Sequence, residues 1–118
     1  MRILVADDEE KIVELIKTFL VKKGHSVDIA ADGRAALDLI NKNNYDVAFF
    51  DHNMPELTGL ELIKIIKQGD IKTKVVLLTG YPAMKDVLAK SIGADGYLNK
   101  PCSLEDIEAV INGFSKQA

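Results

Sequence analysis

Apolar residues recur along the chain in two alternating patterns, as short runs and as longer stretches with helical spacing. The short runs are rich in Val, Ile, Leu and Phe, which is typical of strands buried within a sheet. They predict strands at 2–6, 26–30, 46–50, 74–78 and 96–98. The longer stretches repeat apolar residues every three or four positions, which indicates amphipathic helices. They predict helices at 10–23, 33–42, 58–68, 83–92 and 103–116.

Polar residues and glycine mark the ends of several predicted helices. Asp32 precedes a helix and can accept a hydrogen bond from a first-turn N–H. Thr58 and Glu61 have the spacing of a capping box, in which each side chain bonds the other residue's backbone N–H. Gly24 follows the first predicted helix, where its backbone freedom suits a helix end. These signals support the predicted boundaries.

The order of elements, strand then helix five times over, predicts the fold class. Helical crossovers connect parallel strands and leave helices on both faces of the sheet. We therefore expect an α/β fold, a doubly wound five-stranded parallel sheet of the flavodoxin-like (βα)5 type with strand order 2-1-3-4-5. A length of 118 residues favours one domain over 1–118. Residues 112–118 would form a frayed end or the start of a linker.

Composition excludes several classes of protein. The net charge of −3, from 15 basic and 18 acidic residues, disfavours direct nucleic-acid binding. Cys102 is the single cysteine, which excludes an internal disulfide and a cysteine-built metal site. No apolar run approaches the ~20 residues of a membrane span, and residues 1–6 lack the features of a signal peptide. We expect a cytoplasmic protein without a membrane partner.

Five polar side chains follow the predicted strands directly or closely. They are Asp7, Asp8, Asp51, Thr79 and Lys100. The carboxyl ends of parallel strands share one edge of a doubly wound sheet, and ligands bind there. Each residue alone has an ordinary role as a helix cap, a turn residue or a solvated charge. Their joint placement at one edge favours a common site.

The chemistry of this set suits a metal ion and a phosphoryl group. Clustered carboxylates repel each other unless a cation joins them, and oxygen ligands without His or Cys suit Mg²⁺. A nearby lysine supplies positive charge for a phosphoryl group, and a threonine hydroxyl can bond a phosphoryl oxygen. One carboxylate can act as the nucleophile. The residues therefore indicate metal-assisted phosphoryl transfer onto a protein carboxylate.

The chain resembles the receiver domain of two-component response regulators, which act in bacterial signal transduction. The resemblance covers essentially the whole chain. It is carried by Asp7-Asp8, by Asp51-His-Asn-Met-Pro55 with Gly59, by Thr79-Gly80 and by Lys100-Pro101. It implies that Asp51 is the phosphoacceptor, supplied by the phosphohistidine of a sensor histidine kinase or phosphotransfer protein. It implies a signalling domain rather than an enzyme, with self-catalysed phosphotransfer and autodephosphorylation only.

The resemblance also assigns a metal site. Asp8 and Asp51 would ligate Mg²⁺ directly, together with the main-chain carbonyl of Asn53. Asp7 would act largely through a metal-bound water. Lys100 would contact the phosphoryl group.

Further positions match those that switch the family's conformation or tune its phosphate lifetime. Thr79 would move towards the phosphoryl group. Tyr97, three residues before Lys100, matches the family's aromatic switch position. Asn53 and Tyr81 match positions that tune the lifetime of the aspartyl phosphate.

His52 departs from the family pattern, which usually has an apolar residue directly after the acceptor. One interpretation is a neutral, half-exposed spacer. The alternative is a functional group that confers local pH sensitivity or makes a second metal or phosphate contact. The sequence leaves both open.

The output surface is predicted from the switch positions. Helix 83–92 has the least regular apolar face of the chain, and strand 96–98 beside it is short. Low local stability suits a switching element. We predict that the face formed by 83–92, 96–98 and 103–116 binds an output domain, a partner or a second copy.

Other functions compete with this interpretation. A degenerate receiver would act only as a protein-interaction module. This chain, however, has all five polar residues of the candidate site. An aspartyl-phosphate phosphatase of the haloacid dehalogenase type needs a second acid where this chain has Asn53. A flavin carrier needs a loop rich in Thr, Ser and Gly after the first strand, and this chain has Asp-Asp-Glu-Glu at 7–10. Nucleotide-binding glycine motifs are absent.

Overall fold

The strands form one parallel sheet. The computed structural model describes residues 1–52, 54, 56–69, 71–80, 93–100 and 102–115. Within these residues, five strands pair in the order β2-β1-β3-β4-β5. They are β1 (Arg2–Ala6), β2 (Ser26–Ala30), β3 (Val47–Asp51), β4 (Lys74–Thr79) and β5 (Gly96–Asn99). The predicted fold class and strand order are confirmed.

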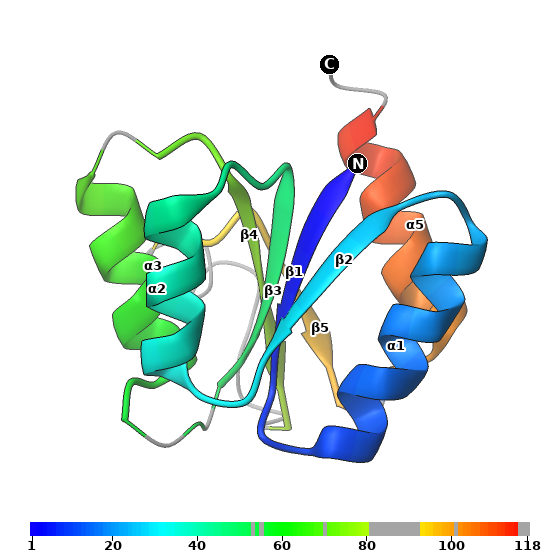
Figure 1. Cartoon of the computed structure of the whole chain (residues 1–118), viewed down its shortest axis with the longest axis horizontal. Coiled ribbons are helices and arrows are strands. Elements are labelled where there is room, and N and C mark those ends of the chain that lie inside the picture. The colour runs from blue at the N-terminus through cyan, green and yellow to red at the C-terminus, as the bar shows by residue number, and fades with distance from the viewer. Residues whose placement is uncertain (53, 55, 70, 81–92, 101, 116–118) are drawn as a thin grey trace.

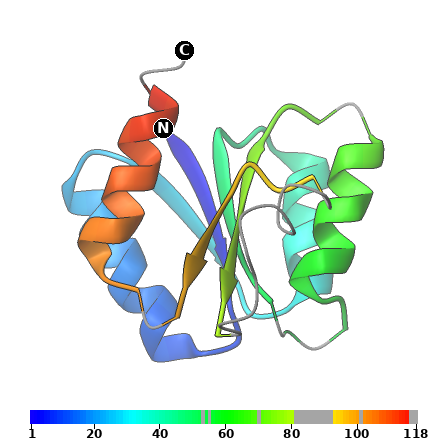
Figure 2. The same cartoon turned by 180° about the vertical axis from the view of Figure 1, so that it is seen from behind.

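The helices cover both faces of this sheet. They are α1 (Glu10–Lys22), α2 (Gly33–Lys42), α3 (Gly59–Gln68) and α5 (Leu104–Ser115). Figure 1 shows α2 and α3 on one face and α1 and α5 on the other, and Figure 2 shows the same two layers from behind. The predicted helix at 83–92 lies outside the described residues. Among the described helices, none has the length and apolar character needed to cross a membrane.

Alternation along the central strands creates two apolar layers. Leu4 and Phe50 belong to the cluster that packs beneath α2 and α3. Ile3 and Phe49 belong to the cluster that packs beneath α1 and α5. Successive strand residues point to opposite faces, so a strand covered on both sides must be apolar at every position. This explains the continuous apolar runs of the sequence.

The predicted helix signals form the expected contacts. Asp32 accepts a hydrogen bond of 2.8 Å from the backbone N–H of Ala35. Thr58 and Glu61 form a reciprocal capping box, with distances of 3.1 and 3.2 Å. Gly24 follows α1 with a φ of 93°, a left-handed conformation that favours glycine.

Two of the candidate residues lie inside strands rather than after them. The predicted strand 46–50 is shifted by one residue, to Val47–Asp51, and the predicted strand 74–78 extends by one residue, so Asp51 ends β3 and Thr79 ends β4. Asp51 pairs in register with Leu78 of β4, and Thr79 pairs with Asn99 of β5. The sheet therefore fixes the backbone of both residues.

Gly59, the first residue of α3, lets this helix approach the end of β3. A Cβ atom at this position would overlap the backbone carbonyl oxygen of Asp51 and lie 2.9 Å from Leu77 Cδ1. The Gly59 N–H donates a 3.2 Å hydrogen bond to the His52 carbonyl. The small residue thus allows α3 to pack directly behind the candidate acceptor.

Candidate functional site

Three carboxylates meet at the carboxyl end of the sheet. Asp7 and Asp8 follow β1, Asp51 ends the neighbouring β3, and one ligand oxygen from each lies within 4.8 Å of the others. Asp7 is only 1% exposed and Asp51 only 7%, whereas Asp8 is exposed. The sheet topology thus brings together the three acids singled out from the sequence.

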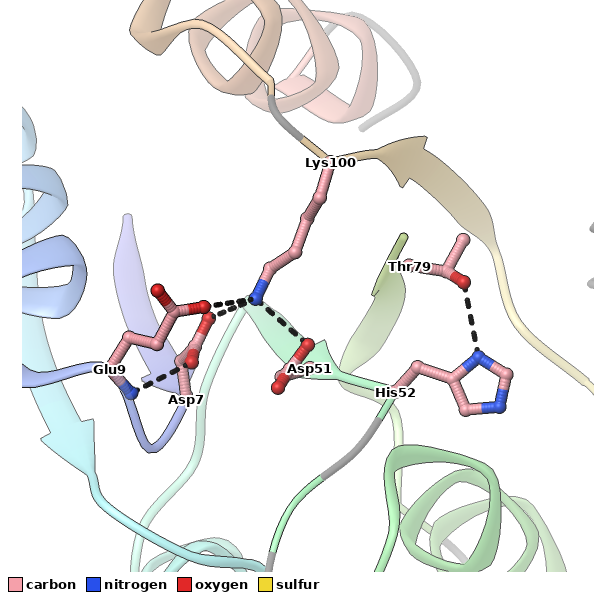
Figure 3. Close-up of polar contacts among 6 residues, drawn as sticks. All are labelled: Asp7, Glu9, Asp51, His52, Thr79 and Lys100. Carbon is pink, nitrogen blue, oxygen red and sulfur yellow. Dashed lines mark hydrogen bonds and ion pairs between the residues drawn. The ribbon is translucent and has the colours of Figure 1, made fainter. Parts of the chain in front are cut away.

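Lys100 supplies the positive charge among these acids. Its Nζ lies 2.8 Å from Asp7 Oδ2, 2.9 Å from Asp51 Oδ1 and 3.3 Å from Glu9 Oε1 (Figure 3). Its backbone N–H donates a 2.6 Å hydrogen bond to the Thr79 carbonyl, which holds the residue at the end of β5. The ammonium group therefore sits between the buried carboxylates.

Glu9 is a site residue that the sequence analysis missed. Besides its ion pair with Lys100, its backbone N–H donates a 3.0 Å hydrogen bond to Asp7 Oδ1. Asp7 therefore uses one oxygen for the loop backbone and the other for Lys100. The sequence position of Glu9 could have indicated this role, because the loop that carries Asp7 and Asp8 also brings Glu9 to the same edge of the sheet.

The surroundings shift two pKa values in the site. Burial raises the pKa of the Asp51 carboxyl, and the nearby charge of Asp7 adds to this, while the hydrogen bond from Lys100 opposes it. Burial alone would lower the pKa of Lys100, but the hydrogen bonds to Asp7 and Asp51 outweigh burial and raise it. Lys100 therefore remains an ammonium ion at neutral pH.

Thr79 and Tyr97 lie on the adjoining strands. Thr79 is fully buried, and its Oγ1 lies 3.1 Å from Nδ1 of His52 (Figure 3). Tyr97 is half-buried and pairs in register with Leu77, two residues before Thr79. Alternation places Thr79 and Leu77 on the same face of the sheet, and Leu77 and Tyr97 pack with the cluster beneath α2 and α3.

Two of the candidate residues cannot be placed in this geometry. Asn53, expected to offer a main-chain carbonyl, and Tyr81 lie outside the described residues. Their expected roles remain predictions.

Neutralising Asp51 is expected to stabilise the metal-free protein. Because its pKa is raised on folding, the folded state holds more protons than the unfolded state just above the ordinary carboxyl pKa. The free energy of unfolding therefore falls as pH rises through that window. We expect Asp51→Asn to melt about 3–6 °C higher at neutral pH in EDTA, the effect of ~1 kcal/mol in a domain of this size. The gain should vanish below about pH 4, where both states are protonated.

Thermal melts between about pH 3 and pH 8 would measure this difference. Asp38→Asn is the matched control, because Asp38 is exposed on α2. A lower melting temperature for Asp51→Asn at neutral pH would show that the ion pair with Lys100 outweighs the burial of the carboxylate.

Comparison with known proteins identifies the family. The sequence model described as the response regulator receiver domain matches residues 3–112. The chain belongs to this family. The receiver domain of Francisella response regulator 1452 is 38% identical, with a TM-score of 0.93 over 98% of this receiver domain and 97% of that chain. The response regulator TrrA from Thermotoga maritima, whose structure is a complex with Mg²⁺-BeF, is 34% identical, with a TM-score of 0.85 over 96% and 97% of the two chains.

Longer relatives match this chain over part of their own length. The transcriptional regulatory protein DltR from Streptococcus agalactiae is 34% identical over 119 residues, which cover 100% of this chain and 53% of DltR. The transcriptional regulatory protein TcrA from Mycobacterium tuberculosis is 35% identical over 118 residues, which cover 47% of TcrA. The chain thus spans about half the length of the curated relatives it matches.

Proposed function

We propose that this receiver domain accepts a phosphoryl group on Asp51 from the phosphohistidine of a sensor histidine kinase or phosphotransfer protein. The observation that carries the proposal is the buried Asp51 carboxylate, grouped with Asp7 and Asp8 and paired with the Lys100 ammonium. An Asp51 oxygen forms the new O–P bond as the P–N bond of the donor breaks. The donor imidazole leaves with that electron pair.

We further propose Mg²⁺ as the cofactor of this transfer. The three acids offer only carboxylate oxygens, close enough together for one ion, which suits a hard divalent cation. Asp8 and Asp51 would hold it with the main-chain carbonyl of Asn53, and Asp7 would act through a bound water. When bound, Mg²⁺ neutralises charge on the phosphoryl oxygens. The Mg²⁺-BeF complex of TrrA supports the same metal here.

Lys100 would provide the second positive charge for the phosphoryl oxygens. Its Nζ already lies 2.9 Å from Asp51 Oδ1, so little movement is needed to reach a group attached to that carboxylate. Asp7 and Glu9 hold the ammonium from the other side. A preorganised charge of this kind stabilises phosphoryl transfer without costly rearrangement.

Thr79 and Tyr97 would convert phosphorylation into a conformational change. The phosphoryl group would draw the Thr79 hydroxyl towards it, and Tyr97 would move between exposed and buried positions as Thr79 vacates space. A covalent group at Asp51 can act at a distance only by shifting an equilibrium between two conformations. Asn53 and Tyr81 would tune the lifetime of the aspartyl phosphate.

The output surface would consist of 83–92, β5 and α5, of which β5 and α5 are described. It would bind an output domain or a second copy of the receiver domain. The regulators DltR and TcrA are about twice as long as this chain, which supports an output domain as the partner. We propose that the phosphoryl transfer takes place in the cytoplasm, where the single cysteine, Cys102, stays reduced.

Incubation with acetyl phosphate tests the proposed function. We expect intact-mass spectrometry to show one added phosphoryl group with Mg²⁺ and none with excess EDTA. Amide spectra with and without beryllofluoride should change most in β5 and α5. No adduct with any divalent cation would instead indicate a degenerate receiver that acts as an interaction module. Main changes in α1 and α2 would overturn the proposed output surface.

A further inference from the structure

The His52 side chain contacts the hydroxyl proposed to move on phosphorylation. His52 Nδ1 lies 3.1 Å from Thr79 Oγ1. Figure 3 shows this hydroxyl turned towards the imidazole ring, on the side of Thr79 that lies away from the Asp51 carboxylate and the Lys100 ammonium. The contact therefore directs the hydroxyl towards His52 rather than towards Asp51.

Backbone hydrogen bonds hold the main chain of His52 beside Thr79. The His52 N–H donates a 2.8 Å hydrogen bond to the carbonyl of Leu78 in β4, and the His52 carbonyl accepts a 3.2 Å hydrogen bond from Gly59. His52 is thus held between the end of β4 and the start of α3. Thr79 is fully buried, so its hydroxyl depends on protein partners rather than bulk water.

We propose that His52 is a positioning residue that holds Thr79 in its resting orientation and so sets how readily the site accepts a phosphoryl group. The inference rests on the proposed function of Asp51 and Thr79. Either tautomer gives one hydrogen bond, because Nδ1–H can donate to Oγ1 or the hydroxyl can donate to Nδ1. In both cases a movement of Oγ1 towards Asp51 would lengthen this contact, because the hydroxyl is turned towards His52. The energy of this contact therefore opposes the active conformation.

Loss of the contact should strengthen binding of a phosphoryl mimic. The apparent affinity for a ligand is lowered when the competent conformation is only partly populated. The net contribution of one neutral hydrogen bond corresponds to roughly a fivefold change in an equilibrium constant. We expect His52→Leu to bind beryllofluoride with Mg²⁺ about fivefold more tightly than the wild type.

Two amide variants separate hydrogen bonding from the size and polarity of the side chain. In His52→Asn the shorter side-chain amide places a polar atom near the position of Nδ1, whereas in His52→Gln the amide lies farther out, near the position of Nε2. We expect His52→Asn to bind beryllofluoride within about twofold of the wild type, and His52→Gln to resemble His52→Leu. Equal affinities for His52→Leu and the wild type would overturn the proposal.

A double-mutant cycle assigns the effect to Thr79. Thr79→Val keeps the shape of the side chain but removes the hydroxyl, so the contact with His52 Nδ1 is lost. In that background His52→Leu should change the beryllofluoride Kd by less than about 1.5-fold. An unchanged fivefold effect would show that His52 acts on the ligand directly and would overturn the positioning role.

A ligand-free measurement keeps this inference separate from the proposed function. Three-bond couplings report the χ1 rotamer of Thr79 in the resting protein. We expect one dominant rotamer in the wild type and in His52→Asn, and rotamer averaging in His52→Leu. If the wild type fails to bind beryllofluoride, the proposed function fails, and the rotamer populations still decide whether His52 holds Thr79. The same single rotamer in His52→Leu would overturn the inference.

Discussion

Asp51→Asn is expected to abolish phosphorylation by acetyl phosphate and by a histidine kinase. The amide has nearly the shape of the carboxylate, but it lacks the anionic oxygen that attacks phosphorus. Labelling should fall by at least about 100-fold, because loss of a nucleophile leaves only background reactions. Intact-mass spectrometry of the variant beside the wild type measures the loss directly.

Two other aspartates provide the controls for this experiment. Asp8→Asn should slow labelling but leave the adduct on Asp51, because it removes a proposed metal ligand and keeps the acceptor. Asp38→Asn on α2 should label like the wild type, since Asp38 is exposed and lies in a helix, apart from the acidic cluster. Undiminished labelling of Asp51→Asn would move the acceptor to another side chain, which peptide mapping would identify.

The fold could be predicted from the sequence because burial dictates its pattern. β1 and β3 are covered on both faces, so residues such as Leu4 and Phe49 had to be apolar regardless of their direction. Polar residues then had to gather at the strand ends. The apolar pattern alone could not show that Asp51 and Thr79 belong to the last pairs of the sheet, because backbone pairing continues past the apolar residues.

The grouping of the site residues was predictable for a topological reason. Asp7 and Lys100 are 93 residues apart in the sequence, yet their charged atoms lie 2.8 Å apart. Parallel strands direct every strand end to the same edge, so residues that follow different strands meet there. Without this topology, neither the residue types nor the sequence separation of Asp7 and Lys100 would indicate that they lie together.

Side-chain partnerships within the site could not be predicted in this way. The turn of the Glu9 backbone N–H towards Asp7, and of the Thr79 hydroxyl towards His52, depends on loop geometry and rotamers. The sequence indicated that His52 was unusual but left its role open between spacer and functional group. The structure shows a direct contact with the proposed switch residue.

Lys100→Met is expected to destabilise the receiver domain, in contrast to Asp51→Asn. The substitution keeps most of the length of the side chain and removes the ammonium that pairs with two buried carboxylates. Removing one partner of a buried ion pair leaves an uncompensated charge, which costs several kcal/mol when burial is complete. Because the Lys100 side chain is 20% exposed, we expect a loss of about 2 kcal/mol. Thermal melts in EDTA would measure it.

Divalent metal should restore much of this stability, because it would supply the positive charge that the variant lacks. A ligand that binds only the folded state stabilises it by about 1.4 kcal/mol at ten times its Kd. Without the Lys100 ammonium the acidic cluster carries more net negative charge, so it should bind the cation more tightly. Mg²⁺ should therefore raise the melting temperature of Lys100→Met more than that of the wild type. Adding Asp7→Asn to Lys100→Met should also recover stability without metal, because it removes one of the two buried charges that paired with Lys100.

The control for this comparison is Lys64→Met, which removes the same charge from an exposed position on α3. It should melt within about 2 °C of the wild type and show the same response to Mg²⁺, since surface charges contribute little. An equal Mg²⁺ response in Lys100→Met and Lys64→Met would show that metal and lysine do not act on the same carboxylates. The combined result thus tests whether one cluster of acids serves both the resting ion pair and the proposed metal site.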